Sequence, residues 1–383
     1  LDNDTGEIDK NTIPAAETVT FIAAKPGLFA PDAVESVGDL VVATIGIPPE
    51  TEGLKDAKHT LVDSDTIRAL LPERPAGSNK GTFGKALIAA GSVNYTGAAA
   101  LSAESAYRIG AGLVAVGAPA PVIAALAARL AEPTWLLLPH DMGVVSSQAA
   151  AVIQEQAKNY NALLLGPGWG QENTTRELLE KLFQRPDDSA KGRAGLSRSL
   201  GFGAHRTSET DEKRDKSELK LPPLVIDADG LNLLAKIDEW WKMLPENTII
   251  TPHPGEMGRL AGVEIADVQK DRWGIAAQKA AEWNVILVLK GAHTLVAAPD
   301  GRVSALPFKT AALATAGTGD VLAGAIVGLL AQGLAPYDAA IVAGYLHGLA
   351  GEIAAEQHGN THSVIAGDVL RALPDAFRRL SVG

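Results

Sequence analysis

The strongest chemical signal in the sequence is a glycine-rich turn at residues 315–324, which leads into a run of small apolar residues. Gly317 and Gly319 allow positive φ angles and a close approach of the backbone to a ligand. The free N–H groups at the start of the following helix suit a phosphate. Asp320 falls in the first helical turn, where it can cap the helix or, beside a phosphate, take a proton from a reacting hydroxyl. A lone Gly-x-Gly-Asp is a weak motif, so the choice depends on the rest of the chain.

Glycine-rich or polar segments also follow several apolar runs that read as strands. They are 166–170 (Gly-Pro-Gly-Trp-Gly), 227–232 (Asp-Ala-Asp-Gly-Leu-Asn), 251–256 (Thr-Pro-His-Pro-Gly-Glu) and 290–294 (Lys-Gly-Ala-His-Thr). In open α/β sheets ligands gather beyond the carboxyl ends of the strands. We therefore expect these four segments to face one cleft.

Individual residues in these segments have both a structural and a functional interpretation. Asp229 is placed to cap a helix, while Asp227 and Asn232 could face the cleft. A lone histidine is usually structural, but the prolines on both sides of His253 favour a positioned hydrogen-bond donor to a ligand. Lys290 at a strand end suits a nucleotide phosphate or ribose, with a solvated surface charge as the alternative.

Two familiar phosphate-binding motifs are excluded because other residues occupy their required positions. Residues 78–85 superficially resemble a P-loop, but Asn79 replaces the first glycine and Ala86 stands where Ser or Thr should follow the lysine. The turn at 315–324 fails as a dinucleotide fingerprint because Leu322 occupies the third glycine position. No His/Cys/Asp cluster has metal-ligand spacing, so we expect no metal site of the protein's own and a divalent ion that arrives with nucleotide phosphates.

The elements that must position these residues follow an alternating pattern of strands and helices from about residue 59. The apolar runs are 86–91, 113–116, 135–138, 162–165, 224–227, 248–251 and 285–289, and helical patterns cover 97–110, 319–333, 336–357 and 366–380. Runs that are apolar throughout indicate strands buried on both faces. The fold class is therefore α/β with a mainly parallel sheet, and 294–298 with 302–306 reads as an antiparallel hairpin at one edge.

The first 50 residues read differently from the rest. Residues 18–22 and 39–45 indicate strands separated by a Lys-Pro-Gly turn, and two or three strands are too few to fold alone. We place a domain boundary in the polar connector 48–53, which gives a segment at 1–50 and a domain at 54–383. Within that domain, residues 184–223 are rich in charged residues, Ser and Gly, and we expect a polar surface insertion.

Composition narrows the class of protein. The 383 residues are 46% hydrophobic and 21% charged, with a net charge of −11 and no cysteine. The charge and the lack of a long basic patch argue against nucleic acid as a partner. No apolar run is long enough for a membrane span, and the lack of cysteine suits a cytoplasmic enzyme. The small-residue helices leave room for a homo-oligomer.

With these residues in place, the chain resembles the ribokinase-like NAD(P)H-hydrate dehydratases over about residues 60–380. Four motifs agree in order and spacing: 80–84 (Lys-Gly-Thr-Phe-Gly) with 97–99 (Gly-Ala-Ala), 166–168, 251–256 and 317–320. The resemblance implies a ribokinase-like three-layer sandwich around a mainly parallel sheet. It also implies repair of NAD and NADP cofactors: the S-epimer of the hydrate NADHX or NADPHX is dehydrated to NADH or NADPH, driven by ADP, the expected donor, or ATP, with Mg²⁺.

The resemblance also assigns roles to residues. Asp320 would accept the hydroxyl proton during phosphorylation of the hydrate, and the amides from Gly317 to Asp320 would stabilise the transferring phosphoryl group. The expected hydrate-binding residues are Ala98, Gly168, His253 and Asp320; the expected nucleotide-binding residues are Lys290, Gly291, Ala292, His293, Thr294 and Gly319; and the expected supporting residues are Lys80, Asp227, Asn232 and Glu256.

Residues 1–47 are similar to the C-terminal end of the NAD(P)H-hydrate epimerase domain that bacteria often fuse ahead of the dehydratase. The epimerase's catalytic and potassium-binding residues lie mostly upstream of Leu1, so we expect this chain to lack epimerase activity. Two alternatives to the dehydratase stay open. One is a kinase of the same fold that acts on a small hydroxymethyl vitamin precursor, and the other is a catalytically silent nucleotide-binding protein.

Overall fold

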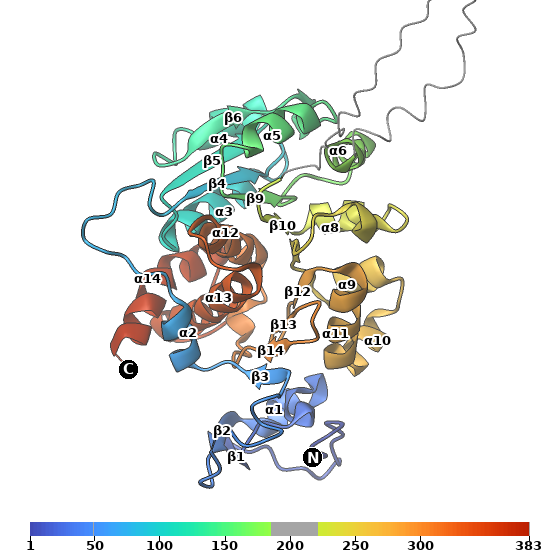
Figure 1. Cartoon of the computed structure of the whole chain (residues 1–383), viewed down its shortest axis with the longest axis vertical. Helices are drawn as coiled ribbons and strands as arrows, with labels where there is room; N and C mark the ends of the chain where they lie inside the picture. The colour runs from blue at the N-terminus through green and yellow to red at the C-terminus, as the bar shows by residue number, and fades with distance from the viewer. Residues whose placement is uncertain (49, 185–220, 383) are drawn as a thin grey trace, which may run out of the picture.

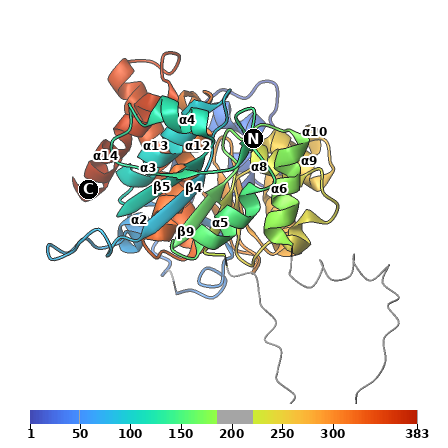
Figure 2. The same ribbon diagram turned by 90° about the horizontal axis from the view of Figure 1, so that it is seen from above.

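The structure is a computed structural model that describes residues 1–48, 50–184 and 221–382. Most of the insertion expected at 184–223 lies outside the described residues. Within them, the chain from β3 onward forms one large sheet with helices on both faces (Figures 1 and 2).

The central sheet has ten strands in the order β3-β14-β13-β12-β11-β10-β9-β4-β5-β6. From edge to edge they are β3 (His59–Leu61), β14 (Val303–Ala305), β13 (Leu295–Ala297), β12 (Ile286–Leu289), β11 (Ile249–Ile250), β10 (Leu224–Ile226), β9 (Ala162–Leu165), β4 (Lys85–Ala89), β5 (Leu113–Ala118) and β6 (Thr134–Leu137). Among these described strands only β13 runs antiparallel to its neighbours. The mainly parallel α/β sheet expected from the sequence is confirmed. The expected hairpin is β13–β14, and β3 covers its outer edge.

Helices cover both faces of this sheet, which explains why its strands are apolar throughout. Along β9, Ala162 and Leu164 enter one core while Leu163 and Leu165 enter the other. The first core is covered by α2 (Ser64–Leu70), α3 (Thr96–Arg108), α4 (Ala120–Leu126), α12 (Thr318–Ala331), α13 (Pro336–His358) and α14 (Ala366–Val382). The second is covered by α5 (Ala149–Ala157), α6 (Asn173–Phe183), α8 (Asp229–Leu234), α9 (Pro254–Ala261), α10 (Ile265–Lys270) and α11 (Arg272–Trp283). The three layers match the expected sandwich.

Small residues let α12 lie directly against α3. A Cβ on Gly324 would come within 2.3 Å of Ser102 O, so only glycine permits this approach. Ser102 and Ser105 of α3 donate hydrogen bonds of 3.1 and 2.6 Å to the carbonyls of Asp320 and Val321. The first turn of α12 is therefore fixed by its neighbour.

The N-terminal segment forms a small unit of its own beside the large sheet. β1 (Glu17–Phe21) and β2 (Asp39–Ala43) pair in parallel, joined through η1 (Pro26–Phe29), η2 (Pro31–Ala33) and α1 (Val34–Val37). The expected strands are present. The stretch expected as a simple turn instead begins η1, because parallel strands need a crossover connection. Leu28, Phe29, Ala33 and Val37 pack into the second core. The domain boundary at 48–53 stays a prediction.

The remaining short elements are β7 (His140–Asp141), β8 (Val144–Val145), η3 (Trp240–Met243) and η4 (Ala311–Leu313). Across the described ranges, the helices include none with the length and apolar character that a membrane crossing requires.

Candidate active site

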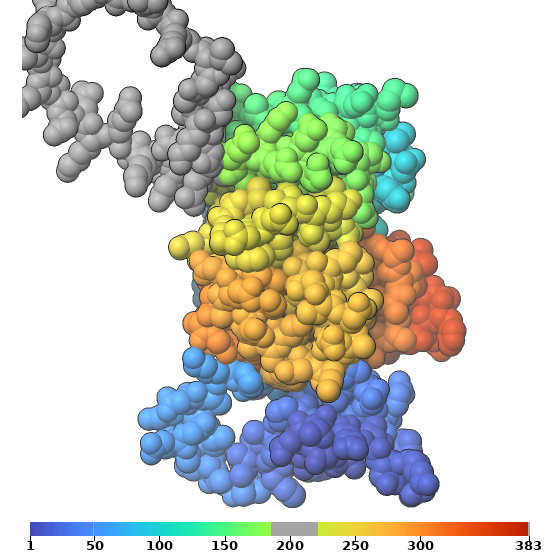
Figure 3. All heavy atoms as spheres, turned by 90° about the vertical axis from the view of Figure 1, so that its right-hand side faces the viewer, coloured from blue at the N-terminus to red at the C-terminus, as the bar shows by residue number. Residues whose placement is uncertain are grey.

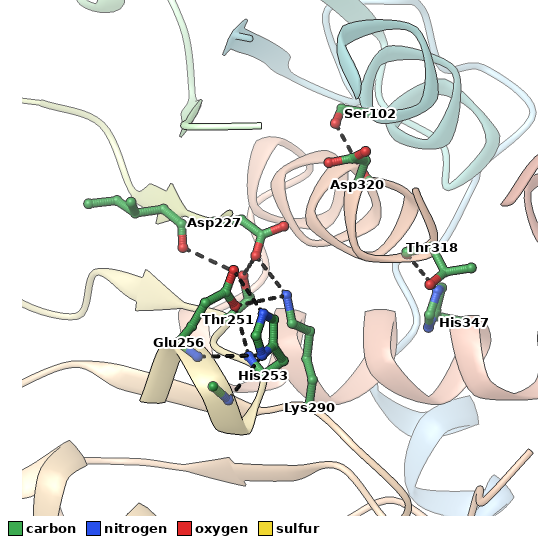
Figure 4. Close-up of polar contacts among 11 residues, drawn as sticks. Ser102, Asp227, Thr251, His253, Glu256, Lys290, Thr318, Asp320 and His347 are labelled. Atoms are coloured by element: carbon green, nitrogen blue, oxygen red, sulfur yellow. Dashed lines mark hydrogen bonds and ion pairs between the residues drawn. The ribbon is translucent and has the colours of Figure 1, made fainter. Parts of the chain in front are cut away.

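A cluster of buried charges lies where β10, β11 and β12 end (Figure 4). Asp227, directly after β10, is 1% exposed, and its Oδ1 accepts hydrogen bonds from Lys290 Nζ at 2.9 Å and Thr251 Oγ1 at 2.6 Å. Lys290 Nζ also lies 3.6 Å from Oε2 of Glu256. The cluster exists because parallel strands deliver the residues that follow them to one edge of the sheet.

The charges in this cluster stabilise one another. Burial alone would lower the pKa of the Lys290 ammonium, but Asp227, Glu256 and Asp320 favour its charged form and raise the pKa overall. Burial raises the pKa of Glu256, with Lys290 opposing the shift. Lys290 therefore keeps its charge at the centre of this cluster.

His253 begins α9 and is held there by a capping box. Its Nδ1 accepts hydrogen bonds from the N–H groups of Gly255 at 3.0 Å and Glu256 at 3.4 Å, and Glu256 Oε2 accepts one from the His253 N–H at 2.9 Å. An Nδ1 that accepts carries no proton, so the neutral ring has its proton on Nε2. Burial, with Lys290 and Arg259, lowers the pKa of His253. The Nε2–H of this neutral ring lies 3.5 Å from Glu256 Oε1, and the side chain is 51% exposed. The role of His253 in orienting a ligand stays a prediction.

The start of α12 lies beside the charged cluster. Gly317 has φ 93°, and a Cβ on Gly319 would stand 3.5 Å from Lys290 Nζ and 3.8 Å from Asp227 Oδ2. Burial, together with the charge of Asp227, raises the pKa of Asp320 to about 7. A carboxyl group with this pKa can both accept and release a proton near neutral pH. The structure therefore combines a glycine-rich helix start, a cation and a carboxyl group of raised pKa at one place.

A histidine that the sequence analysis did not single out holds the first turn of α12 by a hydrogen bond. His347 of α13 is 7% exposed, and its Nε2 lies 2.9 Å from the carbonyl oxygen of Thr318, where it donates (Figure 4). Burial lowers the pKa of His347 to about 4, so it stays neutral. A histidine in an otherwise apolar helix was the available signal, but nothing in the sequence identified its partner.

The loop after β9 brings two further predicted residues together. A Cβ on Gly168, where φ is 65°, would lie 2.8 Å from the Cβ of Ala98, so the loop and the start of α3 are in direct contact. On its other side, Gly170 N donates to Asp229 Oδ2 at 2.9 Å. Asp229 was expected to cap its own helix. It instead holds the glycine loop, because Ala228 takes the N-cap position with φ 52° and makes no side-chain cap.

A cavity of about 300 Å³ opens on the other side of the α12 start. It is lined by four of the five residues expected in the nucleotide loop, Lys290, Gly291, Ala292 and Thr294, and by Gly319. His293 is the exception. Its side chain is 6% exposed and its Nδ1 lies 3.2 Å from Leu306 O, so the imidazole faces away from the cavity.

Much of the cavity wall comes from residues that the sequence analysis missed. The wall includes Phe308, Lys309, Gly344 and Gly348. A Cβ on Gly344 would lie 2.4 Å from Leu306 Cδ1, and one on Gly348 would lie 2.2 Å from Phe308 Cδ2. These glycines of α13 give the segment at 306–309 the room to lie against the helix.

Residues 86–188 and 198–375 match the sequence profile of the NAD(P)H-hydrate dehydratase family. The chain belongs to this family. It is 37% identical over 381 residues to the bifunctional NAD(P)H-hydrate repair enzyme of Moorella thermoacetica, an alignment that covers 99% of this chain and 65% of that protein. The bifunctional enzyme of Escherichia coli is 31% identical over 370 residues, covering 97% and 62%. The chain thus spans a little under two thirds of the length of these relatives.

The structural comparison agrees with the family assignment. The ADP/ATP-dependent NAD(P)H-hydrate dehydratase of Bacillus subtilis, co-crystallised with ATP and Mg²⁺, superimposes with a TM-score of 0.66 at 31% identity. The match covers 84% of this chain and 98% of the Bacillus protein.

Two predicted supporting residues of this NAD(P)H-hydrate dehydratase family member lie elsewhere. Lys80 precedes β4 and therefore sits at the amino end of the sheet, where neighbouring Gly84 packs against Ala331 at the far end of α12. It does not join the charged cluster. Asn232 accepts a hydrogen bond of 2.9 Å from Arg259 Nε and so joins α8 to α9. Its amide supports the scaffold around Asp227 and His253.

A divalent cation was expected to arrive with nucleotide phosphates. In the described ranges no three His, Cys, Asp or Glu side chains are grouped as a metal site. Mg²⁺ is typically held by one or two carboxylates plus phosphate oxygens and waters. Asp227 and Glu256 are the carboxylates nearest Lys290. They could share an ion that arrives on the phosphates.

Proposed function

We propose that this chain dehydrates the S-epimer of NADHX or NADPHX to NADH or NADPH at the expense of ADP or ATP. The observation that carries the proposal is Asp320, whose pKa is raised to about 7, in the first turn of a helix that begins beside Lys290. Family membership and the repair enzymes among its relatives support the same reaction.

The chemistry needs a phosphorylation because hydroxide is a poor leaving group. Asp320 takes the proton of the hydrate's hydroxyl as its oxygen attacks the terminal phosphorus of the nucleotide. The N–H groups around Gly317 to Asp320 and the Lys290 ammonium stabilise the charge on the transferring group. Phosphate then leaves the hydrate carbon, aided by electron release from the ring nitrogen. Loss of a proton from the adjacent ring carbon restores the dihydropyridine.

The hydrate and the nucleotide would bind on opposite sides of Asp320. On the side of Ala98, Gly168 and His253, we propose that the hydrate binds, with the His253 Nε2–H as a donor. On the side of the cavity formed by 290–294 and α13, we propose that the nucleotide binds. Mg²⁺ would be held by its phosphates with Asp227 and Glu256, and it would neutralise phosphate charge.

Several finer points belong to the same proposal. ADP rather than ATP as the usual donor, a homo-oligomeric assembly and a cytoplasmic location are consistent with this class of metabolic enzyme. We also propose that residues 1–50 derive from an epimerase domain. Each of these needs its own measurement.

The deciding experiment follows absorbance at 340 nm after the protein is mixed with NADH hydrate and Mg²⁺, with ADP, ATP or no nucleotide. A nucleotide-dependent rise that disappears in Asp320→Asn establishes the dehydratase and identifies its phosphoryl donor. No rise with either nucleotide, together with phosphorylation of a small hydroxymethyl compound, would favour the vitamin-precursor kinase instead.

A further inference from the structure

The N-terminal segment touches the wall of the nucleotide cavity through Lys309. The Lys309 ammonium donates hydrogen bonds to the carbonyl oxygens of Val34 at 3.1 Å and Gly38 at 2.6 Å, the first residue of α1 and the residue that directly follows this short helix. Lys309 itself lines the cavity. The segment 26–38 is therefore attached to a residue of the cavity wall, and the space-filling view shows the N-terminal residues lying against the later, orange part of the chain (Figure 3).

A second contact reaches the nucleotide loop through His293. The imidazole of His293 meets the ring of Phe29 edge-on, with ring centroids 4.9 Å apart and an interplanar angle of 90°. His293 has φ 51°, a left-handed conformation that is unfavourable for a non-glycine residue. Such a conformation persists only where the surroundings hold it. Phe29 on one side and Leu306 O on the other hold this ring, and with it the path of the loop.

A third contact acts on the carbonyls of the same loop. The Arg272 guanidinium donates to the carbonyl oxygens of Ala292 at 2.5 Å and Leu289 at 3.2 Å. The next residue, Trp273, packs edge-on against Phe29 with centroids 5.8 Å apart. One phenyl ring thus touches both the loop and the start of the helix that holds the loop's carbonyls.

We propose that Phe29 is a positioning residue for the nucleotide cavity and that the segment 26–38 sets the affinity for nucleotide. Phe29 does not line the cavity. It acts through His293 and Trp273, while the carbonyls of Val34 and Gly38 act through Lys309. The inference rests on the proposed function only for the identity of the ligand, a nucleoside di- or triphosphate. We expect the hydrate side, around Ala98 and Gly168, to be unaffected.

The test is equilibrium binding of Mg·ATP and Mg·ADP to the full chain, measured by calorimetry for wild type, Phe29→Ala and Phe29→Leu. We expect Kd to rise about tenfold or more in Phe29→Ala and less in Phe29→Leu, which keeps most of the apolar volume. Phe21→Ala is the matched control, because Phe21 lies in β1, outside the segment 26–38, and is 59% exposed. A folded Phe29 variant with wild-type Kd overturns the proposal. If Phe29→Ala fails to fold, Phe29→Leu alone decides.

A double-mutant cycle separates positioning from a general loss of stability. In a His293→Gly background the left-handed strain and the ring contact are both absent, so Phe29→Ala should weaken nucleotide binding much less than it does in wild type. Equal effects in both backgrounds would overturn the inference. In the dehydratase assay, Phe29→Leu should raise KM for the nucleotide and leave KM for the hydrate within about twofold.

Binding of Mg·ATP does not require the dehydration step, so the two proposals can fail independently. A wild-type chain that binds nucleotide but leaves NADH hydrate unchanged would refute the proposed function and leave this inference standing. If the wild-type chain dehydrates NADH hydrate and Phe29→Leu leaves the nucleotide KM unchanged, the proposed function stands and this inference is refuted.

Discussion

The two sides of the α12 start are built in opposite ways. On one side, Asp227, Glu256 and Lys290 form a buried network in which each charge depends on the others. On the other, the cavity beside residues 290–294 is walled largely by glycines, apolar side chains and backbone, with Lys309 and with Lys290, which the two sides share. Its shape depends on the lack of side chains at Gly344 and Gly348. We therefore expect the charged network to lose stability when a charge is removed. We expect the cavity to lose affinity for its ligand when an atom is added to its wall.

The largest expected effect is on kcat, from a change at Asp320 in the first turn of α12. Asp320→Asn keeps the shape of the side chain but cannot accept a proton, so kcat should fall by about 10²–10⁴-fold. Because the carboxyl pKa is about 7, the wild-type rate should rise with pH up to about 7 and then level off. The measurement is the 340 nm assay across pH. Nucleotide affinity within a few-fold of wild type is the control, and a variant that retains wild-type kcat would show that Asp320 is not the base.

The charged side can be broken with Lys290→Met. Removing the ammonium leaves Asp227 and Glu256 buried without their cation, and we expect a loss of roughly 3 kcal/mol in the free energy of unfolding. Denaturant unfolding measures this. Adding Asp227→Asn should recover part of the loss, since it removes one uncompensated charge. If the double variant is as unstable as the sum of both single changes, the charges are not coupled.

The shape of the cavity can be disturbed by adding a single methyl group to its wall. Gly348→Ala would place a Cβ 2.2 Å from Phe308 Cδ2, so the ring must move into the cavity or carry its segment away. We expect about a tenfold rise in the nucleotide Kd and little change in the hydrate KM. Gly77→Ala, whose Cβ would meet nothing within 4 Å, is the control. Unchanged nucleotide binding would mean that the ligand lies elsewhere.

The smallest effect concerns stability and its pH dependence. Unfolded Asp320 ionises near its ordinary pKa of 3.8, but the folded group stays protonated up to about 7. Between these values the unfolded state binds fewer protons, so this residue makes the fold less stable as pH rises. Asp320→Asn should therefore stabilise the protein by about 1–2 kcal/mol at pH 8 and have little effect at pH 4. Thermal melts against the exposed control Asp56→Asn measure the difference. A variant that is less stable at pH 8 would contradict the assigned direction.

The charged cluster could be predicted from sequence more completely than the cavity. The mainly parallel sheet follows from strands that are apolar throughout, and the residues of the charged cluster follow from their place just after those strands. Lys80 carried a suggestive motif, yet it precedes its strand and lies at the other end of the sheet. Position relative to the strand was the better guide than residue type.

The cavity could be predicted only in part. The loop 290–294 was accessible because it contains a lysine and a glycine after a strand. Gly344 and Gly348 were not, because glycines in a helix read as close packing and the element that packs on them, 306–309, is distant in sequence. The direction of His293 was equally hidden, since it depends on Phe29, more than 260 residues earlier in the chain.

The first turn of α12 has its carbonyls held by three side chains from other helices: Thr318 O by His347, Asp320 O by Ser102 and Val321 O by Ser105. A turn anchored in this way cannot rotate to meet a ligand. The backbone of the turn is already ordered before any phosphate arrives, so the reorganisation free energy is spent during folding and not during turnover. Nucleotides should therefore bind at this turn in a single kinetic step, with no ordering phase.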